Sequence, residues 1–360
     1  MFVIIPLALC LVLTGAPVQR KTPAQHAQAG WDALNAGRAQ EAAVAFDEAL
    51  RGAPREPSVL LGAGVAAHLL GQPDAVRRYL FEALKHEPAL TAASLLLGET
   101  FYRANDIAAA IDVYDKALVH APAHRQLNDR LEAWRKEAAL HDRFGQKLGD
   151  HFTVLFEGPA EAELAQKAVE ILEAAYWRIG SALYTYPSDV IGVVLYTREQ
   201  FSDITRSPKW AAAAYDGRIR VPVRGALQNV RDFERVLTHE FTHALIRTIA
   251  PRGVPVWLNE GLAMMFDGTD VEAKAAQLRG VEERLPLTRL EGSFERLDTA
   301  SATMAYATSG VAAHLLVREI GAPSVVSILT DIGRGMPFPE AFERHANITY
   351  AEFQRKLVAN

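Results

Sequence analysis

The sequence VLTHEFTHALI at residues 236–246 decides how the C-terminal half of this 360-residue chain is interpreted. His239 and His243 are four residues apart, so on a helix their imidazole rings project from one face, about one turn apart. This spacing allows both rings to bind one tetrahedral ion, and it lets Glu240 reach the open side of that ion as a general base. Apolar residues recur around the motif at helical spacing: Phe233, Val236, Leu237, Phe241, Leu245 and Ile246.

A catalytic zinc ion needs a third protein ligand and one position left for water. The sequence WLNEGLA at residues 257–263 offers Glu260 for that role. The sixteen residues between His243 and Glu260 leave room for the first helix to end, for a turn at residues 251–255, and for a second helix to return. We therefore predict a metal site. The alternative is a pair of helix histidines with ordinary hydrogen-bond partners.

The two segments resemble the gluzincin metallopeptidases, in particular the peptidase-MA-like domains and the zinc aminopeptidases, which share the NEG[FL]A pattern seen at residues 259–263. The resemblance implies an α+β, thermolysin-like domain with zinc ligands His239, His243 and Glu260 and with Glu240 as catalytic base. The segment AYATS, at residues 305–309, is similar to the AYxxS segment of peptidase-MA-like domains. By that similarity Tyr306 steadies the oxyanion; the alternative is a tyrosine packed on a helix.

The sequence also departs from these families. No GxMEN segment occurs in the chain, which argues against aminopeptidase action and leaves an endopeptidase or an unusual hydrolase. Met264 stands where thermolysin-like enzymes carry an aspartate that supports the metal site. A metal-bound histidine normally donates its other N–H to an acceptor, so we expect one here. Asp232 and Asp267 are the two choices that the sequence leaves open.

The resemblance implies one zinc ion per chain and a mechanism for peptide hydrolysis. A zinc-bound water attacks the peptide bond while Glu240 takes its proton and passes it to the leaving amine, and Tyr306 donates to the oxyanion. We therefore expect a zinc endopeptidase acting on a protein or peptide substrate. Two alternatives remain: a catalytically silent, metal-stabilised scaffold that mediates protein–protein interaction, and a zinc hydrolase for a non-peptide amide or ester.

The first part of the chain, from about residue 23 to 124, repeats with a period of 34 residues. This pattern resembles the tetratricopeptide repeat, and it predicts a helical solenoid of three helix pairs, with residues 125–144 as a capping helix. The concave face of such a stack suits a substrate or an adaptor protein; the alternative is a packing platform for the enzyme domain. The aligned columns are Gly30, Gly64 and Gly98; Gly37, Gly71 and Asn105; Ala49, Ala83 and Ala117; Leu50, Leu84 and Leu118; and Pro54, Pro88 and Pro122.

The repeats, at residues 23–144, are expected to be joined by a linker at 145–149 to a peptidase domain at 150–360. Hydrophobic periodicity predicts strands at 151–156 and 190–196, and helices at 161–179, 304–319 and 323–332. Asp216 and Gly217 predict a turn, and residues 218–223 then alternate like a hairpin or edge strand, with which Pro222 agrees. The resemblance implies that extended substrate pairs with this strand, although an edge strand needs no substrate. The less regular region between residues 268 and 303 could roof the cleft.

Residues 1–20 contain an apolar run from Phe2 to Leu13 that predicts a secretory signal peptide or a retained N-terminal anchor. We therefore expect export to the periplasm or another extracytoplasmic space, with membrane contact only through that anchor. Cys10 is the only cysteine, so intrachain disulfides and cysteine–metal sites are excluded, and any metal is held by histidine and carboxylate. The net charge of −5 argues against nucleic-acid binding, which requires a concentrated basic face.

Overall fold

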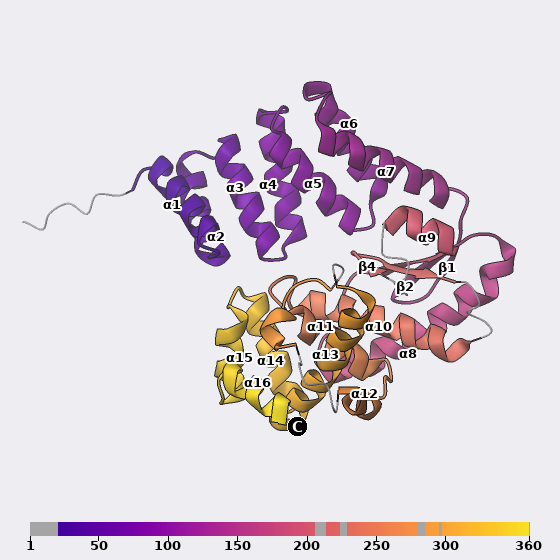
Figure 1. Cartoon of the computed structure of the whole chain (residues 1–360). Coiled ribbons are helices and arrows are strands. Elements are labelled where there is room, and N and C mark those ends of the chain that lie inside the picture. The colour runs from indigo at the N-terminus through magenta and orange to yellow at the C-terminus, as the bar shows by residue number, and fades with distance from the viewer. Residues whose placement is uncertain (1–20, 206–213, 224–228, 279–284, 295–296, 360) are drawn as a thin grey trace, which may run out of the picture.

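The structure is a computed structural model that describes residues 21–205, 214–223, 229–278, 285–294 and 297–359. An arch of helices forms the N-terminal part, a small sheet follows it, and a second group of helices completes the chain (Figure 1). The signal peptide or anchor predicted for residues 1–20 lies outside the described residues. Among the described helices, none is by itself long and apolar enough to span a membrane. The bent pair Thr299–Ile320 and Ala322–Gly333 passes this test of length and composition only when taken together.

The N-terminal arch is a stack of helix pairs of the tetratricopeptide type, and each pair matches one 34-residue repeat (Figure 1). A seventh helix caps the stack with the apolar residues Leu127, Leu131 and Trp134 buried against it. The helices are α1 (Pro23–Asn35), α2 (Ala39–Gly52), α3 (Pro57–Leu69), α4 (Pro73–His86), α5 (Thr91–Arg103), α6 (Ile107–His120) and α7 (Arg125–His141).

The glycine columns of the repeat have a packing reason and a backbone reason. A Cβ atom at Gly30 would lie 2.8 Å from the ring of Phe46 on the partner helix, so only glycine permits this approach. The second column lies in the turn between the two helices. Gly37 and Gly71 have φ of 73° and 68° there, and Asn105 adopts 67° at the equivalent turn. These positions require the left-handed conformation that glycine and asparagine tolerate best.

The sheet has five strands in the order β1-β2-β3-β5-β4. β2, β3 and β5 are parallel to one another, while β1 and β4 pair antiparallel at the two edges. The central strand β3 is buried along its whole length, as its run of apolar residues predicts. The strands are β1 (Gly145–Leu148), β2 (Phe152–Phe156), β3 (Ile191–Tyr196), β4 (Ala214–Tyr215) and β5 (Ile219–Pro222).

The prediction of a linker at residues 145–149 was wrong. This segment forms β1, which pairs with β2 from Gly145 opposite Phe156 to Leu148 opposite Thr153. All four residues of β1 are exposed, so their side chains carry no alternation by which the sequence could indicate a strand. The repeats therefore run directly into the sheet, and only three residues separate α7 from β1.

The prediction of an edge strand at residues 218–223 was also wrong. β5 lies between β3 and β4, so its hydrogen-bonding groups are already used at Ile219 and Arg220. The hairpin is present, since Asp216 and Gly217 connect β4 to β5. The edge position belongs to β4, which pairs with Ile219 and Arg220 of β5. Pro222 is tolerated because it is the last residue of its strand.

Helices cover both faces of the sheet. On one face, α8 (Ala162–Leu183) and α10 (Val230–Ile249) pack against the strands around Phe152, Leu172 and Phe241. On the other face, Phe201 of α9 (Arg198–Thr205) packs on Tyr196, together with Leu140 and Phe144 from the end of the repeat stack. The end of the repeat stack therefore contributes to the hydrophobic cluster on this face of the sheet.

The C-terminal helices form a further core around the buried Trp257 of α11 (Val256–Phe266). The region between residues 268 and 303, expected to be irregular, contains α12 and the short helix η2 where the structure describes it. The remaining helices are η1 (Pro159–Glu161), α12 (Val271–Leu278), η2 (Leu287–Arg289), α13 (Thr299–Ile320), α14 (Ala322–Gly333), α15 (Phe338–Ala346) and α16 (Tyr350–Ala359).

Candidate metal centre

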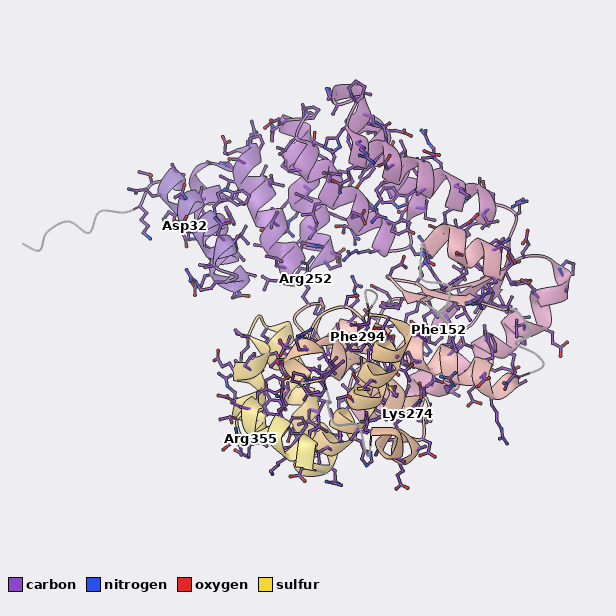
Figure 2. All side chains as sticks on the ribbon, in the orientation of Figure 1. Asp32, Phe152, Arg252, Lys274, Phe294 and Arg355 are labelled. Carbon is purple, nitrogen blue, oxygen red and sulfur yellow. The ribbon has the colours of Figure 1, made fainter. Side chains whose placement is uncertain are left out.

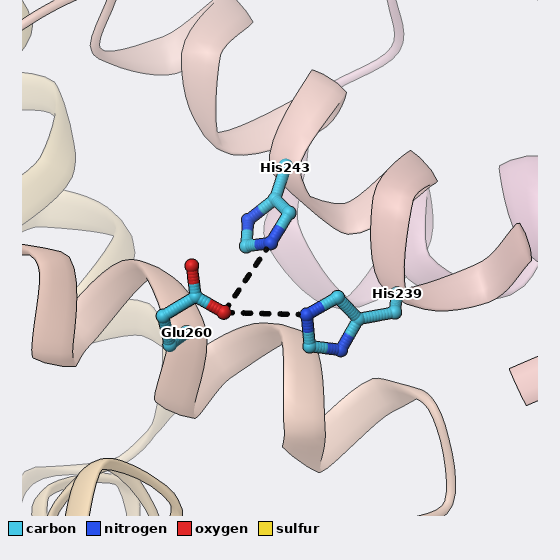
Figure 3. Close-up of side chains that lie close together, drawn as sticks. All are labelled: His239, His243 and Glu260. Atoms are coloured by element: carbon cyan, nitrogen blue, oxygen red, sulfur yellow. Dashed lines mark hydrogen bonds and ion pairs between the residues drawn. The ribbon is translucent and has the colours of Figure 1, made fainter. Parts of the chain in front are cut away.

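The two helices that carry the predicted ligands face each other. α10 begins at Asn229, whose side chain accepts a hydrogen bond from the backbone N–H of Asp232 and so caps the helix. Its apolar face is buried against the sheet, which leaves His239 and His243 on another face. The chain turns at Gly253, where φ is 82°, and α11 then returns with Glu260 opposite the two imidazole rings (Figure 3).

The distances from Glu260 to the two imidazole rings match the ligand spacing of a tetrahedral metal site. Oε2 of Glu260 lies 3.3 Å from Nε2 of His239 and 3.6 Å from Nε2 of His243 (Figure 3). One ligand atom from each of the three residues lies within 4.8 Å of the others. Ligand atoms placed about 2.0–2.2 Å from a tetrahedral zinc ion are about 3.3–3.6 Å apart. The donor set and its spacing therefore fit zinc.

Asp267 fixes the orientation of one of the two rings. Nδ1 of His239 is 2.8 Å from Oδ2 of Asp267, a carboxylate whose side chain is 1% exposed. Its other oxygen accepts hydrogen bonds from the backbone N–H and the hydroxyl of Thr269. A carboxylate held in this way directs Nε2 of His239 toward Glu260. Nδ1 of His243, in contrast, is buried without a hydrogen-bond partner among the described residues.

Of the two aspartates that the sequence left open, Asp267 is therefore the one that contacts the histidines. Asp232 lies in the first turn of α10, exposed, with Asn229 and Arg235 as its partners. The sequence contained a signal for this choice. Asp267 follows Glu260 by seven residues, which is two helical turns, so the residue that caps the C-terminus of α11 lies on the same side as Glu260.

The charges of the site favour a cation. Burial alone would lower the pKa of His239, but hydrogen bonds with Asp267 and Glu260 outweigh burial and raise this pKa to about 10. Burial would raise the pKa of Glu260, but the neighbouring His243 and His239 hold it well below its usual range. Burial raises the pKa of Glu240, against the opposing effect of both histidines. Without an ion, the proton that His239 shares with Asp267 and Glu260 supplies positive charge at the place where a divalent ion would supply it.

Tyr306 lies on α13, partly buried. Its ring makes an edge contact with Phe294, with 5.4 Å between the centroids (Phe294 is labelled in Figure 2). α13 packs closely on α11. Glycine at position 261 permits this approach, since a Cβ atom there would clash with the carbonyl oxygen of Ser309. The structure thus brings the helix of Tyr306 beside the helix of Glu260 and shows a packing role for the ring.

The strand expected to pair with substrate instead binds the repeats. Glu137 of α7 accepts hydrogen bonds from Nη1 of Arg218, at 3.1 Å, and from Nη1 of Arg220, at 2.7 Å. The three side chains are 1–2% exposed. Arg220 also donates to the Tyr102 hydroxyl on α5 and to the Asp216 carboxylate. Sequence reasoning missed this ion network, because nothing local connects Glu137 to two arginines more than 80 residues later.

Comparison with known proteins gives structural neighbours that are TPR domains. No protein-family model and no curated protein matches this chain. Among solved structures, the chain is similar to the first TPR domain of Spaghetti (RPAP3) bound to the HSP90 peptide SRMEEVD. The identity is 15% and the TM-score 0.31, over 33% of this chain and 96% of that chain. It is also similar to the first TPR domain of the human RPAP3 protein, at 15% identity and a TM-score of 0.31, over 33% of this chain and 94% of that chain.

Proposed function

We propose that this protein is a zinc-dependent endopeptidase with His239, His243 and Glu260 as metal ligands and Glu240 as general base. The observation that carries the proposal is the spacing of the three donor atoms, 3.3 Å and 3.6 Å from Glu260 to the two rings, which suits a tetrahedral ion. The carboxylate of Asp267 behind His239 supports it, because metal-bound histidines normally have such an acceptor.

The residues of the chain would divide the chemistry between them. Bound zinc would polarise the scissile carbonyl and lower the pKa of a water molecule. Glu240 follows His239 directly on α10 and is 8% exposed, so it can take a proton from that water and return it to the leaving amine. We propose that Tyr306, next to the ligand helix, donates to the oxyanion.

The wider setting of the enzyme is part of the same proposal. The repeats recruit a protein substrate or an adaptor, and the protein acts outside the cytoplasm, in the periplasm or an equivalent space. A catalytically silent scaffold is the second candidate, and the buried ion network between α7 and β5 favours it. In that case the metal centre would stabilise a platform that presents the repeats.

The decisive experiment measures zinc content and cleavage of a mixture of denatured proteins on the same preparations. Wild type is expected to hold one zinc per chain and to cleave. Glu240→Gln is expected to keep zinc and lose cleavage, whereas His243→Ala loses both. Equal loss of zinc in the two variants would contradict the assigned roles, and zinc without cleavage in wild type would favour the scaffold.

A further inference from the structure

Three arginines gather where the repeats meet the helix that carries the metal ligands. Arg103 ends α5, Arg247 lies in the last turn of α10, and Arg252 lies in the loop between α10 and α11. Nη2 of Arg252 contacts Nε2 of His68, in the last turn of α3. Figure 2 shows Arg252 between the repeat helices and the C-terminal helices.

Backbone contacts fix this junction on both sides. A Cβ atom at Gly71, in the turn after α3, would clash with Pro251, the neighbour of Arg252. A Cβ atom at Gly217, in the turn between β4 and β5, would clash with the carbonyl group of Arg103. The guanidinium group of Arg247 lies 5.9 Å from the ring centroid of Tyr215 on β4. The three arginines are therefore held near one another by three separate parts of the chain.

In the part of the chain that the structure describes, these arginines lack carboxylate partners. Within the described residues, no carboxylate oxygen lies within 4.0 Å of their nitrogen atoms. The nearest acidic groups that act on Arg103 are Glu99 and Asp216, and each already pairs with another arginine: Glu99 with Arg130 at 2.7 Å, and Asp216 with Arg220 at 3.1 Å.

The groups also repel one another. Burial first, then the charge of Arg247, lowers the pKa of Arg103. Burial, then the charges of Arg103 and Arg247, lowers the pKa of Arg252. The pKa of His68 falls to about 4, through burial and then through Arg252, so His68 adds no positive charge at neutral pH.

The C-terminal ends of three helices neutralise part of the positive charge of these arginines. His68, Arg103 and Arg247 each lie in the last turn of a helix, where the helix dipole is equivalent to about −0.5 charge. Each helix end offsets only part of one positive charge, so the three guanidinium groups together remain positively charged. A negatively charged ligand would balance them.

The cluster lies close to the metal centre along α10. Arg247 follows His243 by four residues, so it is one turn further along the helix, at a rise of about 6 Å. In an extended polypeptide about two residues span that distance. A polypeptide with its scissile bond at the metal, and running along α10 toward the C-terminal end of that helix, would therefore bring a residue two or three positions away to Arg247. Arginine forks bind carboxylates with paired hydrogen bonds, so an acidic side chain fits this position best.

We propose that Arg103, Arg247 and Arg252 bind an acidic side chain of the polypeptide that the metal centre cleaves. This inference rests on the proposed function and names its substrate class: segments with glutamate or aspartate two or three residues from the cleaved bond. The site sets specificity by charge and takes no part in the bond-breaking step.

Binding tests the site separately from catalysis. The full-length, zinc-loaded Glu240→Gln protein is titrated into two fluorescent peptides that differ only in three consecutive glutamates or three consecutive glutamines, and anisotropy is recorded. The acidic peptide is expected to bind at least tenfold more tightly. Combined Arg247→Gln and Arg252→Gln is expected to remove that preference. The double substitution removes the repulsion between like charges but also the contacts of Arg247 with Tyr215 and of Arg252 with His68, so circular dichroism melting of the variant is recorded to check that it is folded.

Arg135→Gln is the matched control, because Arg135 lies on α7 and is already paired with Asp115 at 2.6 Å. It is expected to keep the full preference. Equal binding of the two peptides, or a preference that survives the double substitution, overturns the proposal. Saturable binding of inorganic phosphate without a peptide preference overturns it in favour of a site for free oxyanions.

A parallel cleavage assay on wild type uses the same two peptides. Faster cleavage of the acidic peptide, by the same factor as its tighter binding, supports the substrate class. A binding preference without cleavage of either peptide would leave the arginines as a recognition site and reject the peptidase. The two failures are therefore distinguishable.

Discussion

Two groups of arginines lie between the repeats and the rest of the molecule, and they differ in what neutralises them. Arg218 and Arg220 are buried, and two carboxylates, Glu137 and Asp216, pair with them. The cluster of Arg103, Arg247 and Arg252 is more exposed and has no carboxylate of its own among the described residues. Arginines that are paired with carboxylates stabilise the fold, whereas arginines without carboxylate partners can still bind a negatively charged ligand.

The metal centre also contains more groups of one charge type than of the other, but here carboxyl groups are in excess. Glu240, Glu260 and Asp267 outnumber the two imidazole rings, and all these groups lie close together. The charges are balanced in the network of Glu137, Arg218 and Arg220, which holds the repeats to the sheet. They are not balanced at the arginine cluster or at the metal centre, and these are the two candidate functional sites. The predictions below test this difference, beginning with the largest expected effect.

Glu137→Gln removes the counter-charge from the balanced network and leaves two buried guanidinium groups without a full partner. Breaking a buried ion pair in this way costs about 3–5 kcal/mol. The free energy of unfolding, measured by urea titration, is expected to fall by that amount. Glu132→Gln, an exposed change on the same helix, is expected to alter it by less than about 0.5 kcal/mol. Equal effects of the two substitutions would mean that the network does not hold the repeats to the sheet.

Asp267→Asn addresses the unbalanced metal centre. Loss of a carboxylate that orients a metal-bound histidine typically costs about 10–100-fold in metal affinity. Zinc affinity, measured by competition with a chromophoric chelator, is expected to fall within that range. Asp232→Asn, at the aspartate that faces solvent, is expected to leave affinity unchanged. The assignment of Asp267 fails if both variants bind zinc as wild type does.

Acid is expected to weaken the balanced junction. Burial lowers the pKa of His141 to about 4, below the ordinary 6.5, and its Nε2 lies 2.7 Å from the Tyr196 hydroxyl. Between these pH values the unfolded chain binds a proton that the folded chain does not, so stability is complete above pH 6.5 and falls toward pH 4. We expect a loss of about 3 kcal/mol from this residue.

His141→Gln is the variant that isolates this contribution. It is expected to flatten the dependence of the unfolding free energy on pH between 6.5 and 4, while any effect of Glu137 remains at lower pH because arginines 220 and 218 outweigh burial and lower its pKa. An unchanged slope in the variant would assign the acid sensitivity to other groups, such as His68.

Gly71→Ala and Gly37→Ala form the finest comparison. Both glycines occupy left-handed turns of the repeats, with φ of 68° and 73°, so both substitutions carry a similar backbone cost. Only Gly71 faces Pro251, while the space around Gly37 is open. Gly71→Ala is expected to lower the free energy of unfolding by about 1 kcal/mol more than Gly37→Ala does, and therefore to lower the melting temperature further. Identical shifts would indicate that the turn of the second repeat does not contact the loop before α11.

Sequence reasoning reached some of these features and not others, for physical reasons. His239 and His243 could be predicted because helical spacing alone places two side chains on one face. The glycine columns could be recognised because the two helices of each repeat approach each other closely at the same position, where a larger residue would clash. β1 was not predictable, because its side chains are all exposed and only its backbone pairs.

The alternation of β5 was misleading. Arg218 and Arg220 alternate with the apolar Ile219 and Val221, a pattern that usually marks a strand with one solvent-exposed face. Here the polar face is covered by α7, and the arginines are 1% exposed. A single sequence reports which residues are charged, but the identity of the partner that covers them depends on contacts far apart in the chain.

The absence of a linker between α7 and β1 bears on how the protein is made. Domains fold from the N-terminus during synthesis, so the repeats leave the ribosome while the sheet is still being translated. Glu137 is then already displayed on a formed helix when Arg218 and Arg220 emerge. The solenoid thus serves as an internal template on which the later half assembles, and a chain started at residue 145 would lack Glu137, the carboxylate that pairs with both arginines in the complete protein.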